Sequence, residues 1–443
     1  MKLTVLGLGY LGTTHAVCMA ALGHEVVGID IDSARVAALS QGQLPFHEPG
    51  LPELLKRTLD AHSISFSTDF SQAAEFSHLH FLTVGTPQLP GSEAADLSQV
   101  WSAVDHLVPR LASGNHLLVG KSTVPVGTAE LLQQRVNSVR PPGVTVEVAW
   151  NPEFLREGHG VEDTLHPDRI VVGIQSGWAE QILRQVYAQP CADGTPVLGM
   201  DLATAELVKT AANSFLATKI SFINAMAEIC EATGADVQAL AQALGSDPRI
   251  GSRYLHAGLG FGGGCLPKDI RAFIARAGEL GIGKSLAFLR EVDEINLRRR
   301  QRVIHLAEEL LGNDLRGSTI TVLGAAFKPD SDDVRDSPAL AVAGELFLAG
   351  AQVKVYDPQA NDTARRVSPT LSYAPDISSA LAGADLVILA TEWECFTQLD
   401  PVHAAAIVAT PRMIDARNVL DARQWTAAGW QIRALGRSLQ QSG

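Results

Sequence analysis

The chain has 443 residues, of which 46% are hydrophobic and 19% charged, a composition typical of a globular protein with two or three domains. Its formal net charge of −13 and the scatter of its Lys and Arg residues argue against a nucleic-acid partner. The densest basic run, LRRRQR at 297–302, falls in a helical pattern and is expected to form a solvated helix face.

The cysteines indicate a reducing environment. They are odd in number, widely spaced and without a C-x-x-C pair: Cys18, Cys191, Cys230, Cys265 and Cys395. This pattern argues against a disulfide framework and against a zinc site, so we expect no bound metal. No signal sequence and no run of 18 apolar residues is present, which predicts a cytoplasmic protein without a membrane span.

The first part of the chain alternates strand and helix patterns. LTVLG at 3–7 and EVVGID at 25–30 are apolar runs with a helical segment between them. Further runs of the same kind follow at 80–85, 116–122 and 146–151. Residues 1–200 are therefore predicted to form a doubly wound parallel α/β domain.

The first strand leads into GLGYLG, which places Gly7, Gly9 and Gly12 in G-x-G-x-x-G spacing, and Asp30 ends the next strand. The glycines allow a tight turn, close approach of a pyrophosphate, and packing of helix on strand. Asp30 can bind a ribose diol and would repel a 2′-phosphate, which favours NAD over NADP. The alternative is a glycine turn without a ligand and a surface aspartate.

A long Ala- and Leu-rich helical stretch follows from about 201 to 245, with Asp201 as its expected cap. Its apolar positions wrap widely around the helix, which predicts burial between domains or in a dimer interface. Glu206, Lys209 and Asn213 fall on one face, where Lys209 and Asn213 could donate hydrogen bonds to a developing oxyanion. The alternative is a solvent-exposed polar stripe.

Cys265 lies in GFGGGCLPKD, residues 260–269, directly before an expected helix. The helix dipole and Lys268 would both favour its thiolate, the nucleophilic form. The alternative for a lone cysteine is a small buried hydrophobe, which we expect for Cys18 and Cys230 because they lie in apolar helix patterns.

Two more segments follow expected strands, where ligands of open α/β sheets gather. NPEFLREG at 151–158 carries Glu153 and Glu157, and GKSTVPVGT spans 120–128. Ordinary turn chemistry is the alternative for both.

The α/β pattern restarts at TITVLG, 319–324, and QVKVYD at 352–357 echoes the earlier EVVGID. Gly324 is followed by two alanines, so the glycine spacing of the first unit is missing. We expect this unit to bind something other than a dinucleotide pyrophosphate. The fold predicted for the chain is α/β, with two Rossmann-like doubly wound parallel-sheet domains joined by a long central helix.

The motifs, in their order, resemble those of the UDP-glucose/GDP-mannose dehydrogenase family over nearly the full length. They are GLGYLG, PFHEPGL, VGTP, KSTVPVGT, NPEFLREG, HPDRIVVG, GFGGGCLPKD, FKPDSDDVRDSP and DARNVLD. No single motif decides the resemblance, but the ordered set is specific.

The resemblance implies a four-electron oxidation of a nucleotide-sugar primary alcohol to a carboxylate with reduction of two NAD. Cys265 would attack the C6 aldehyde to give a thiohemiacetal, a second hydride would leave to give a thioester, and water would hydrolyse it. The glycines before Cys265 would let the sugar and its pyrophosphate lie against the loop. UDP-glucose is the expected substrate and UDP-glucuronate the expected product.

The resemblance also assigns residues. Lys209 and Asn213 would be the oxyanion donors, while Asp269, Thr123 and Glu157 would handle protons and the catalytic water beside Cys265. Besides the three glycines and Asp30, the cofactor side comprises Tyr10, Leu11, Arg35, Thr86, Thr123, Glu157, Lys268 and Arg335. The nucleotide-sugar side comprises Glu153, Phe154, Leu155, Lys209, Asn213, Arg249, Tyr254, Gly262, Phe327, Lys328 and Arg417.

The predicted regions are 1–200 for NAD, 201–300 for dimerisation and the catalytic cysteine, and 301–443 for the UDP-sugar. A homodimer is expected through the central helix, with Arg249 acting across the interface. Gly264 stands where serine is common in the family and Leu266 where some members have phenylalanine; neither departure removes a reacting group. The alternatives are oxidation of GDP-mannose or UDP-N-acetylmannosamine, or a non-catalytic NAD-binding regulator.

Overall fold

The computed structural model describes residues 1–437, and the last six residues of the predicted third region lie outside this range. The chain divides into two compact units. The first contains residues 1–212 and 271–283, and the second contains 213–270 and the chain from 284 onward. The predicted central region is thus shared between the two units.

The first unit is built on an eight-stranded sheet in the order β3-β2-β1-β4-β5-β6-β7-β8. The strands are β1 (Lys2–Leu6), β2 (Glu25–Ile29), β3 (Ile64–Ser67), β4 (Leu79–Leu82), β5 (Gly114–Gly120), β6 (Val144–Trp150), β7 (Ile170–Gly173) and β8 (Val197–Met200). All neighbours run parallel except β6 and β7, which are antiparallel. The parallel doubly wound order is the predicted one, and the antiparallel pair is a departure from it.

Helices cover both faces of this sheet. They are α1 (Tyr10–Ala21), α2 (Ser33–Ser40), α3 (Leu51–Asp60), α4 (Phe70–Phe76), α5 (Ser98–Leu107), α6 (Thr128–Val139), α7 (Gly160–Leu165), α8 (Gly177–Val186) and α9 (Ala188–Ala192). One core joins α1, α3 and α8 to the sheet, and the other joins α4, α5 and α6. This two-sided burial explains why the strands read as continuous apolar runs.

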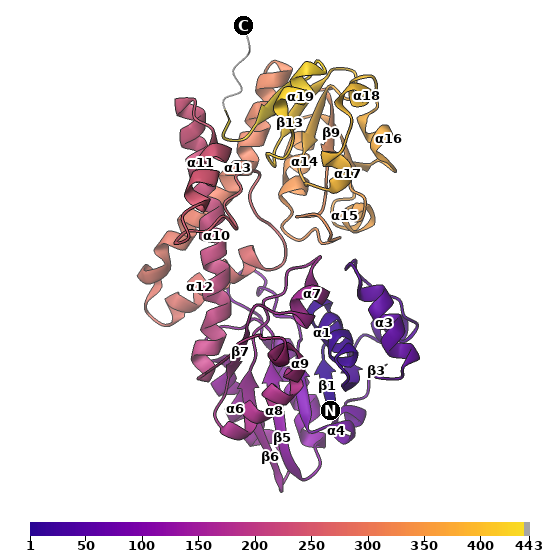
Figure 1. The fold of residues 1–443 in the computed structure, drawn as a ribbon, viewed down its shortest axis with the longest axis vertical. Coiled ribbons are helices and arrows are strands. Elements are labelled where there is room, and N and C mark those ends of the chain that lie inside the picture. Colours follow the sequence, from indigo (N-terminus) through magenta and orange to yellow (C-terminus); the bar gives the residue numbers. More distant parts are fainter. Residues whose placement is uncertain (438–443) are drawn as a thin grey trace. The chain divides into compact units, whose positions relative to one another are not determined.

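The central stretch forms α10 (Leu202–Thr233) and α11 (Val237–Gly245), and α10 appears as one long helix in Figure 1. Asp201 caps α10 as predicted, because its carboxylate accepts the Thr204 N–H at 2.8 Å. The helix ends before Gly234, whose φ of +77° is left-handed. The sequence had not located this break.

The second unit contains a six-stranded, all-parallel sheet in the order β11-β10-β9-β12-β13-β14. The strands are β9 (Thr319–Leu323), β10 (Gln352–Tyr356), β11 (Ser372–Tyr373), β12 (Leu386–Leu389), β13 (Arg412–Asp415) and β14 (Gln431–Ala434). Its helices are α13 (Ala287–Leu311), α14 (Pro338–Leu348), α15 (Asn361–Val367), α16 (Ile377–Leu381), α17 (Glu394–Thr397), α18 (Pro401–Ala405) and α19 (Ala422–Ala427). α12 (Leu266–Glu279) begins in the second unit and ends in the first.

Asp357 gives a physical reason why the second sheet lacks a dinucleotide turn. It occupies the place after β10 that Asp30 occupies after β2, but its buried carboxylate accepts the N–H groups of Ala325 and Ala326 at 2.8 and 2.9 Å and the indole N–H of Trp393 at 3.0 Å. Because the Asp357 carboxylate is buried and already accepts hydrogen bonds from its own chain, it is not available to hold a ribose.

The expectation for the basic run at 297–302 is wrong in part. Arg299 is fully buried, with its guanidinium 3.4 Å from the Glu231 carboxylate, and Arg302 pairs with the same carboxylate at 2.7 Å. Helical spacing places Arg299 on the inner face of α13, where a buried cation needs an ionic partner. Cys18 and Cys230 are buried as predicted.

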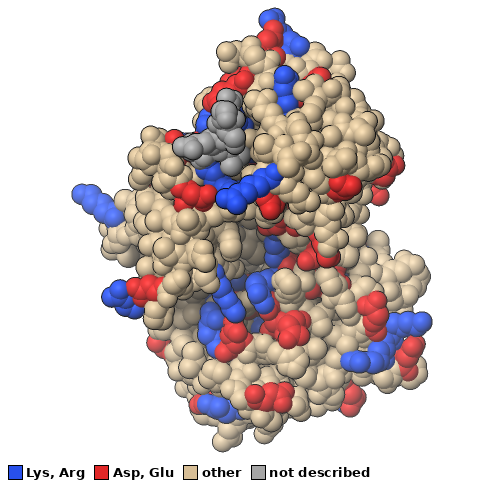
Figure 2. All heavy atoms as spheres, turned by 45° about the horizontal axis from the view of Figure 1, so that its top comes forward, with Lys and Arg blue, Asp and Glu red and all other residues tan. Residues whose placement is uncertain are grey.

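The surface shown in Figure 2 has acidic and basic side chains interspersed within each unit. This arrangement is ordinary for a globular protein surface. Within residues 1–437, no helix combines the length and hydropathy needed to cross a bilayer.

Candidate functional site

The glycine-rich turn after β1 has the geometry that a dinucleotide requires. Gly7 has a φ of +94°, and a Cβ on Gly12 would lie 1.8 Å from the Gly7 carbonyl oxygen, so neither position accepts a side chain. A Cβ on Gly9 would meet nothing within 4 Å, so the backbone at Gly9 is open to a ligand. α1 then begins at Tyr10 without a side-chain cap or an acidic residue in its first turn. Its N–H groups therefore fit the pyrophosphate of NAD.

Asp30 stands beside this turn with its carboxylate already oriented. Its oxygens accept the N–H groups of Leu8 at 2.7 Å and Asp32 at 2.9 Å. Arg35 donates to the same carboxylate at 2.9 Å and is half-exposed. The negative charge of Asp30 is thus partly balanced by Arg35, which is also predicted on the cofactor side.

Two predicted cofactor residues meet at the ends of β4 and β5. The Thr86 hydroxyl donates to the Thr123 carbonyl at 2.7 Å. Just before Thr123 lies Lys121, which sequence reasoning missed. Its buried ammonium donates to the Asn151 side chain at 2.9 Å, and burial lowers the pKa of Lys121 to about 8. A lysine at the carboxyl end of a buried strand was the available signal.

Lys209 and Glu153, both predicted, form an ion pair with the Nζ and Oε1 atoms 2.8 Å apart. The Lys209 side chain is only 5% exposed, so the pair is desolvated. The other oxygen of Glu153 accepts the Leu155 N–H at 2.7 Å. The ring of Phe154 lies 5.8 Å from the Lys209 ammonium and 4.0 Å from the Arg169 guanidinium. Glu153 and Phe154 therefore contact the Lys209 ammonium, and the Leu155 N–H holds the Glu153 carboxylate.

Glu206 has a different function from its helical neighbour Lys209. Its buried carboxylate accepts the N–H groups of Gly127 at 2.7 Å and Ala129 at 2.6 Å, and so caps the start of α6. Burial raises the pKa of Glu206 to about 7. Glu206, Lys209 and Asn213 are all buried, so the solvent-exposed polar stripe considered as an alternative is wrong.

In the second unit, Cys265 is exposed and immediately precedes α12, as predicted. The carbonyl of Cys265 accepts the Asp269 N–H at 2.9 Å in the first turn. The Asp269 carboxylate is buried, and it accepts the Asn213 amide at 2.6 Å and pairs with Lys268 at 2.9 Å. The structure thus joins Asn213, Lys268 and Asp269, three predicted residues, next to the cysteine.

Gly262 and Gly263 are required by the protein's own packing. A Cβ on Gly262 would lie 2.4 Å from the Asp336 carbonyl oxygen, and one on Gly263 would lie 2.8 Å from the Phe327 ring. At Gly264 a Cβ would meet the Arg335 guanidinium at 2.2 Å. Gly264, which stands where serine is common in the family, therefore leaves space that Arg335 fills.

Arg417 connects this glycine run to the predicted sugar-side segment. Its guanidinium donates to the carbonyls of Gly260 at 2.9 Å, Phe327 at 3.3 Å and Ala390 at 2.7 Å. Arg417 therefore holds the backbone beside Lys328, another predicted residue.

Arg249 and Tyr254 lie between α11 and α12. The Arg249 side chain is 87% exposed and pairs with Asp247 at 2.6 Å, while Tyr254 has a left-handed φ of 65°. Their predicted contacts with the sugar remain predictions.

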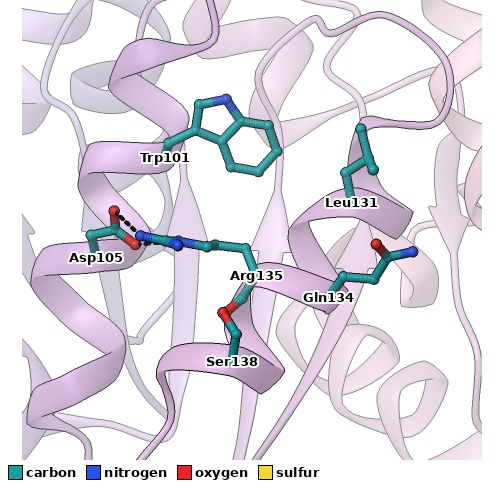
Figure 3. Close-up of a pocket in the computed structure, with 6 residues that line it drawn as sticks. All are labelled: Trp101, Asp105, Leu131, Gln134, Arg135 and Ser138. Atoms are coloured by element: carbon teal, nitrogen blue, oxygen red, sulfur yellow. Dashed lines mark hydrogen bonds and ion pairs between the residues drawn. The ribbon is translucent and has the colours of Figure 1, made fainter.

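One open pocket lies elsewhere, on the first unit, with a volume of about 520 Å³. It is lined by residues of α5 and α6: Trp101, Asp105, Leu131, Gln134, Arg135 and Ser138 (Figure 3). Arg135 and Asp105 form a two-pronged pair at 2.8 Å across it. None of the predicted site residues lines this pocket. Over the described part of the chain, no cluster of three His, Cys, Asp or Glu residues could hold a metal ion.

Known proteins share this organisation. The chain is 39% identical over 439 residues to the UDP-glucose 6-dehydrogenase of Rhizobium meliloti (strain 1021), covering 99% of this chain and 100% of that one. It is 37% identical over 448 residues to the UDP-glucose 6-dehydrogenase of Pseudomonas aeruginosa, covering 99% and 98%.

Solved structures agree. A UDP-glucose dehydrogenase from Pyrobaculum islandicum matches with a TM-score of 0.90 at 40% identity, over 99% of this chain and 98% of that one. A UDP-D-ManNAc dehydrogenase from Pyrococcus horikoshii matches with a TM-score of 0.84 at 25% identity, over 99% of both chains.

Three family models cover most of the sequence. Residues 1–190 match the NAD binding domain, 203–298 the central domain and 321–422 the UDP binding domain. The glycine turn and Asp30 lie in the first match, Cys265 and Asn213 in the second, and Lys328 and Arg417 in the third. The chain belongs to the UDP-glucose/GDP-mannose dehydrogenase family.

Proposed function

We propose that this protein oxidises UDP-glucose to UDP-glucuronate with two molecules of NAD. The observation that carries the proposal is the exposed thiol of Cys265 at the start of α12, one turn from the buried Asp269 and its Asn213 partner. A reactive cysteine needs access to a carbonyl carbon and polar groups that stabilise the resulting oxyanion. Lys209 and Asn213 are buried side chains with N–H donors of the kind that this reaction needs, which supports the proposal.

In this scheme NAD, held by the glycine turn and Asp30, would supply the hydride acceptor for each of two oxidations at C6 of the sugar. The C6 carbon would first lose a hydride and its hydroxyl group a proton, which gives the aldehyde. The Cys265 thiolate then adds to C6, forming a C–S bond and a thiohemiacetal. Loss of its C6 hydride and hydroxyl proton leaves a thioester. Water breaks the C–S bond, which releases the carboxylate and restores the thiol.

The chain's own residues serve these steps as follows. Lys209 and Asn213 lie four positions apart on α10 and would donate hydrogen bonds to the C6 oxygen. Thr123, Glu157 and Asp269 would manage the proton and the hydrolytic water. Arg35, Thr86, Lys268 and Arg335 would contact NAD, while Phe327, Lys328 and Arg417 would contact the UDP-sugar.

UDP-glucose is favoured over related sugars because the more similar relatives carry that substrate in their names. The chain shares 39% identity with a UDP-glucose 6-dehydrogenase but 25% with a UDP-D-ManNAc dehydrogenase. The test is purified protein with NAD and each of UDP-glucose, GDP-mannose and UDP-N-acetylmannosamine. We expect two NADH for each UDP-glucose consumed. A ratio of one with free aldehyde accumulating would remove the protein from the four-electron class.

We further propose that the protein is a homodimer that pairs through α10. Besides its buried side, this helix leaves Phe215, Phe222 and Ile229 exposed by 67%, 49% and 55%. Their spacing of seven residues places them on one face. Large apolar side chains aligned on a helix are the usual mark of an interface.

Light scattering on the wild type and on Phe215→Glu with Phe222→Glu would test the dimer. We expect the double variant to become monomeric while the wild type is dimeric. A monomeric wild-type protein at micromolar concentration would contradict the proposal.

A further inference from the structure

Glu48 is a fully buried carboxylate in the segment that precedes α3, with an exposed fraction of 1%. The segment belongs to PFHEPGL, a motif that had received no chemical role. A carboxylate buried this deeply needs polar partners from its own chain. Glu48 finds them in hydrogen bonds.

Three donors supply these hydrogen bonds, and they come from two other segments. One oxygen of Glu48 accepts the Tyr10 hydroxyl at 2.6 Å and the Gly158 N–H at 2.7 Å. The other oxygen accepts the Gly160 N–H at 2.6 Å. Tyr10 is the residue after Gly9 in the nucleotide turn, and both glycines follow Glu157 in the chain. A single carboxylate thus connects the cofactor turn to the loop 151–160.

The surroundings of Tyr10 are built for this contact. A Cβ on Gly160 would lie 2.5 Å from the Tyr10 oxygen, so only glycine at 160 lets the hydroxyl reach Glu48. The Tyr10 ring packs against Phe46 with the centroids 5.1 Å apart. Burial, the hydrogen bond to Glu48 and the charge of Glu157 raise the pKa of Tyr10, so its hydroxyl remains a donor.

We propose that Glu48 is a positioning residue that fixes the loop carrying Glu153 and Glu157 relative to the nucleotide turn. The proposal rests on the function proposed above, because that function assigns the two loop carboxylates a role at the sugar. One buried carboxylate then fixes the position of the turn that would hold NAD. It also fixes the loop whose carboxylates would handle the sugar's protons. A loop displaced by about 1 Å can cost a hundredfold in rate.

Glu48→Gln tests this with almost no change in shape. Whichever way its amide is oriented, an NH₂ group faces the N–H of Gly158 or of Gly160, and that donor loses its acceptor. We expect hydrogen exchange at that glycine to accelerate about tenfold or more, and kcat with NAD and UDP-glucose to fall about tenfold or more. The KM values should change less than about threefold.

Glu206→Gln is the matched control, because Glu206 is also a buried glutamate that accepts two backbone N–H groups. It should lose thermal stability without faster exchange at Gly158 and Gly160. Tyr10→Phe removes only the link to the nucleotide turn. In the wild type, NADH should slow exchange at the two glycines, and in Tyr10→Phe this slowing should be lost.

Exchange at Gly158 and Gly160 that is unchanged in Glu48→Gln, or a kcat within twofold of the wild type, would overturn the proposal. If Glu48→Gln does not fold, equal slowing by NADH in Tyr10→Phe and in the wild type would overturn it instead. A wild-type protein without activity on UDP-glucose would contradict the proposed function, while the exchange measurements would still decide whether Glu48 holds the loop.

Discussion

Lys209 and Glu153 form a buried ion pair, with Nζ and Oε1 at 2.8 Å. The partner carboxylate comes from the loop after β6, and the lysine from α10. Lys121 also lies near this carboxylate, whose negative charge partly offsets the cost of burying Lys121. The pair holds the Lys209 ammonium at a fixed position, which is what an oxyanion donor requires.

We predict that Lys209→Met lowers kcat by about 10²–10³ with little change in the KM for UDP-glucose, because a donor aimed at an oxyanion acts mainly in the transition state. Steady-state kinetics with NAD check this. Lys56→Met, at an exposed position of α3, is the matched control and should behave as the wild type. An effect confined to KM would instead assign Lys209 to sugar binding.

The pair between Asp30 and Arg35 leads to a prediction on cofactor choice. Wild-type protein should prefer NAD, since the Asp30 carboxylate would repel the 2′-phosphate of NADP. In Asp30→Ala, the Arg35 guanidinium loses its 2.9 Å partner and becomes available to that phosphate. We expect the ratio of kcat/KM for NAD over NADP to fall by tenfold or more, as a charge contact is worth about 1.5–3 kcal/mol.

The double variant Asp30→Ala with Arg35→Ala separates the two effects. Its kcat/KM with NADP should not show the increase expected for Asp30→Ala. Its kcat/KM with NAD should stay as low as in Asp30→Ala. Equal use of NAD and NADP by the wild type would show that Asp30 has no part in discrimination.

Buried histidines should make the protein less stable in acid. Burial and the neighbouring His116 lower the pKa of His80 to about 3. Below about pH 6.5, His80 therefore binds a proton in the unfolded state but stays neutral in the folded state. The free energy of unfolding is then highest above this pH and declines toward pH 3, with a slope of up to about 1.4 kcal/mol per pH unit from this group.

Urea unfolding at pH 7.5 and pH 5.5 checks this prediction. His80→Gln should lose about 1–2 kcal/mol less than the wild type between the two pH values. His106→Gln, at an exposed position, should show the wild-type loss. If His80→Gln loses as much as the wild type, protonation of His80 is not part of the acid response.

The sequence predicted the parts of the fold that depend on local pattern. The strand, glycine turn and Asp30 after β2 follow from hydrophobic runs and spacing, and so does the thiol at the start of α12. The missing glycine spacing after β9 also correctly set the second sheet apart, and Asp357 supplies the physical reason.

Long-range partners could not be predicted in this way. Helical spacing put Glu206 and Lys209 on one face, but it could not tell that Glu206 caps α6 some 77 residues earlier in the chain. It also could not distinguish the buried Arg299 from the exposed Arg298, because the acceptor Glu231 lies on another helix. Glu48 was missed for the same reason, since all of its partners lie in other segments.

The nucleophilic role proposed for Cys265 gives the final prediction. We expect Cys265→Ala to bind NAD and UDP-glucose as the wild type does and to form essentially no UDP-glucuronate. Without the thiolate no thiohemiacetal forms, so the aldehyde is not held for its second oxidation. Because Cys265 is exposed, its truncation leaves no core cavity and the melting temperature should change little.

Thermal melts, ligand titrations and product analysis on the same preparations make the test. Cys395→Ala is the matched control, since it removes another exposed thiol in the same unit and should leave acid formation unchanged. A well-folded Cys265→Ala protein that makes acid at nearly the wild-type rate would show that the second oxidation runs through an aldehyde hydrate. In that case water, and not the Cys265 sulfur, would add to the aldehyde carbon before the second hydride leaves.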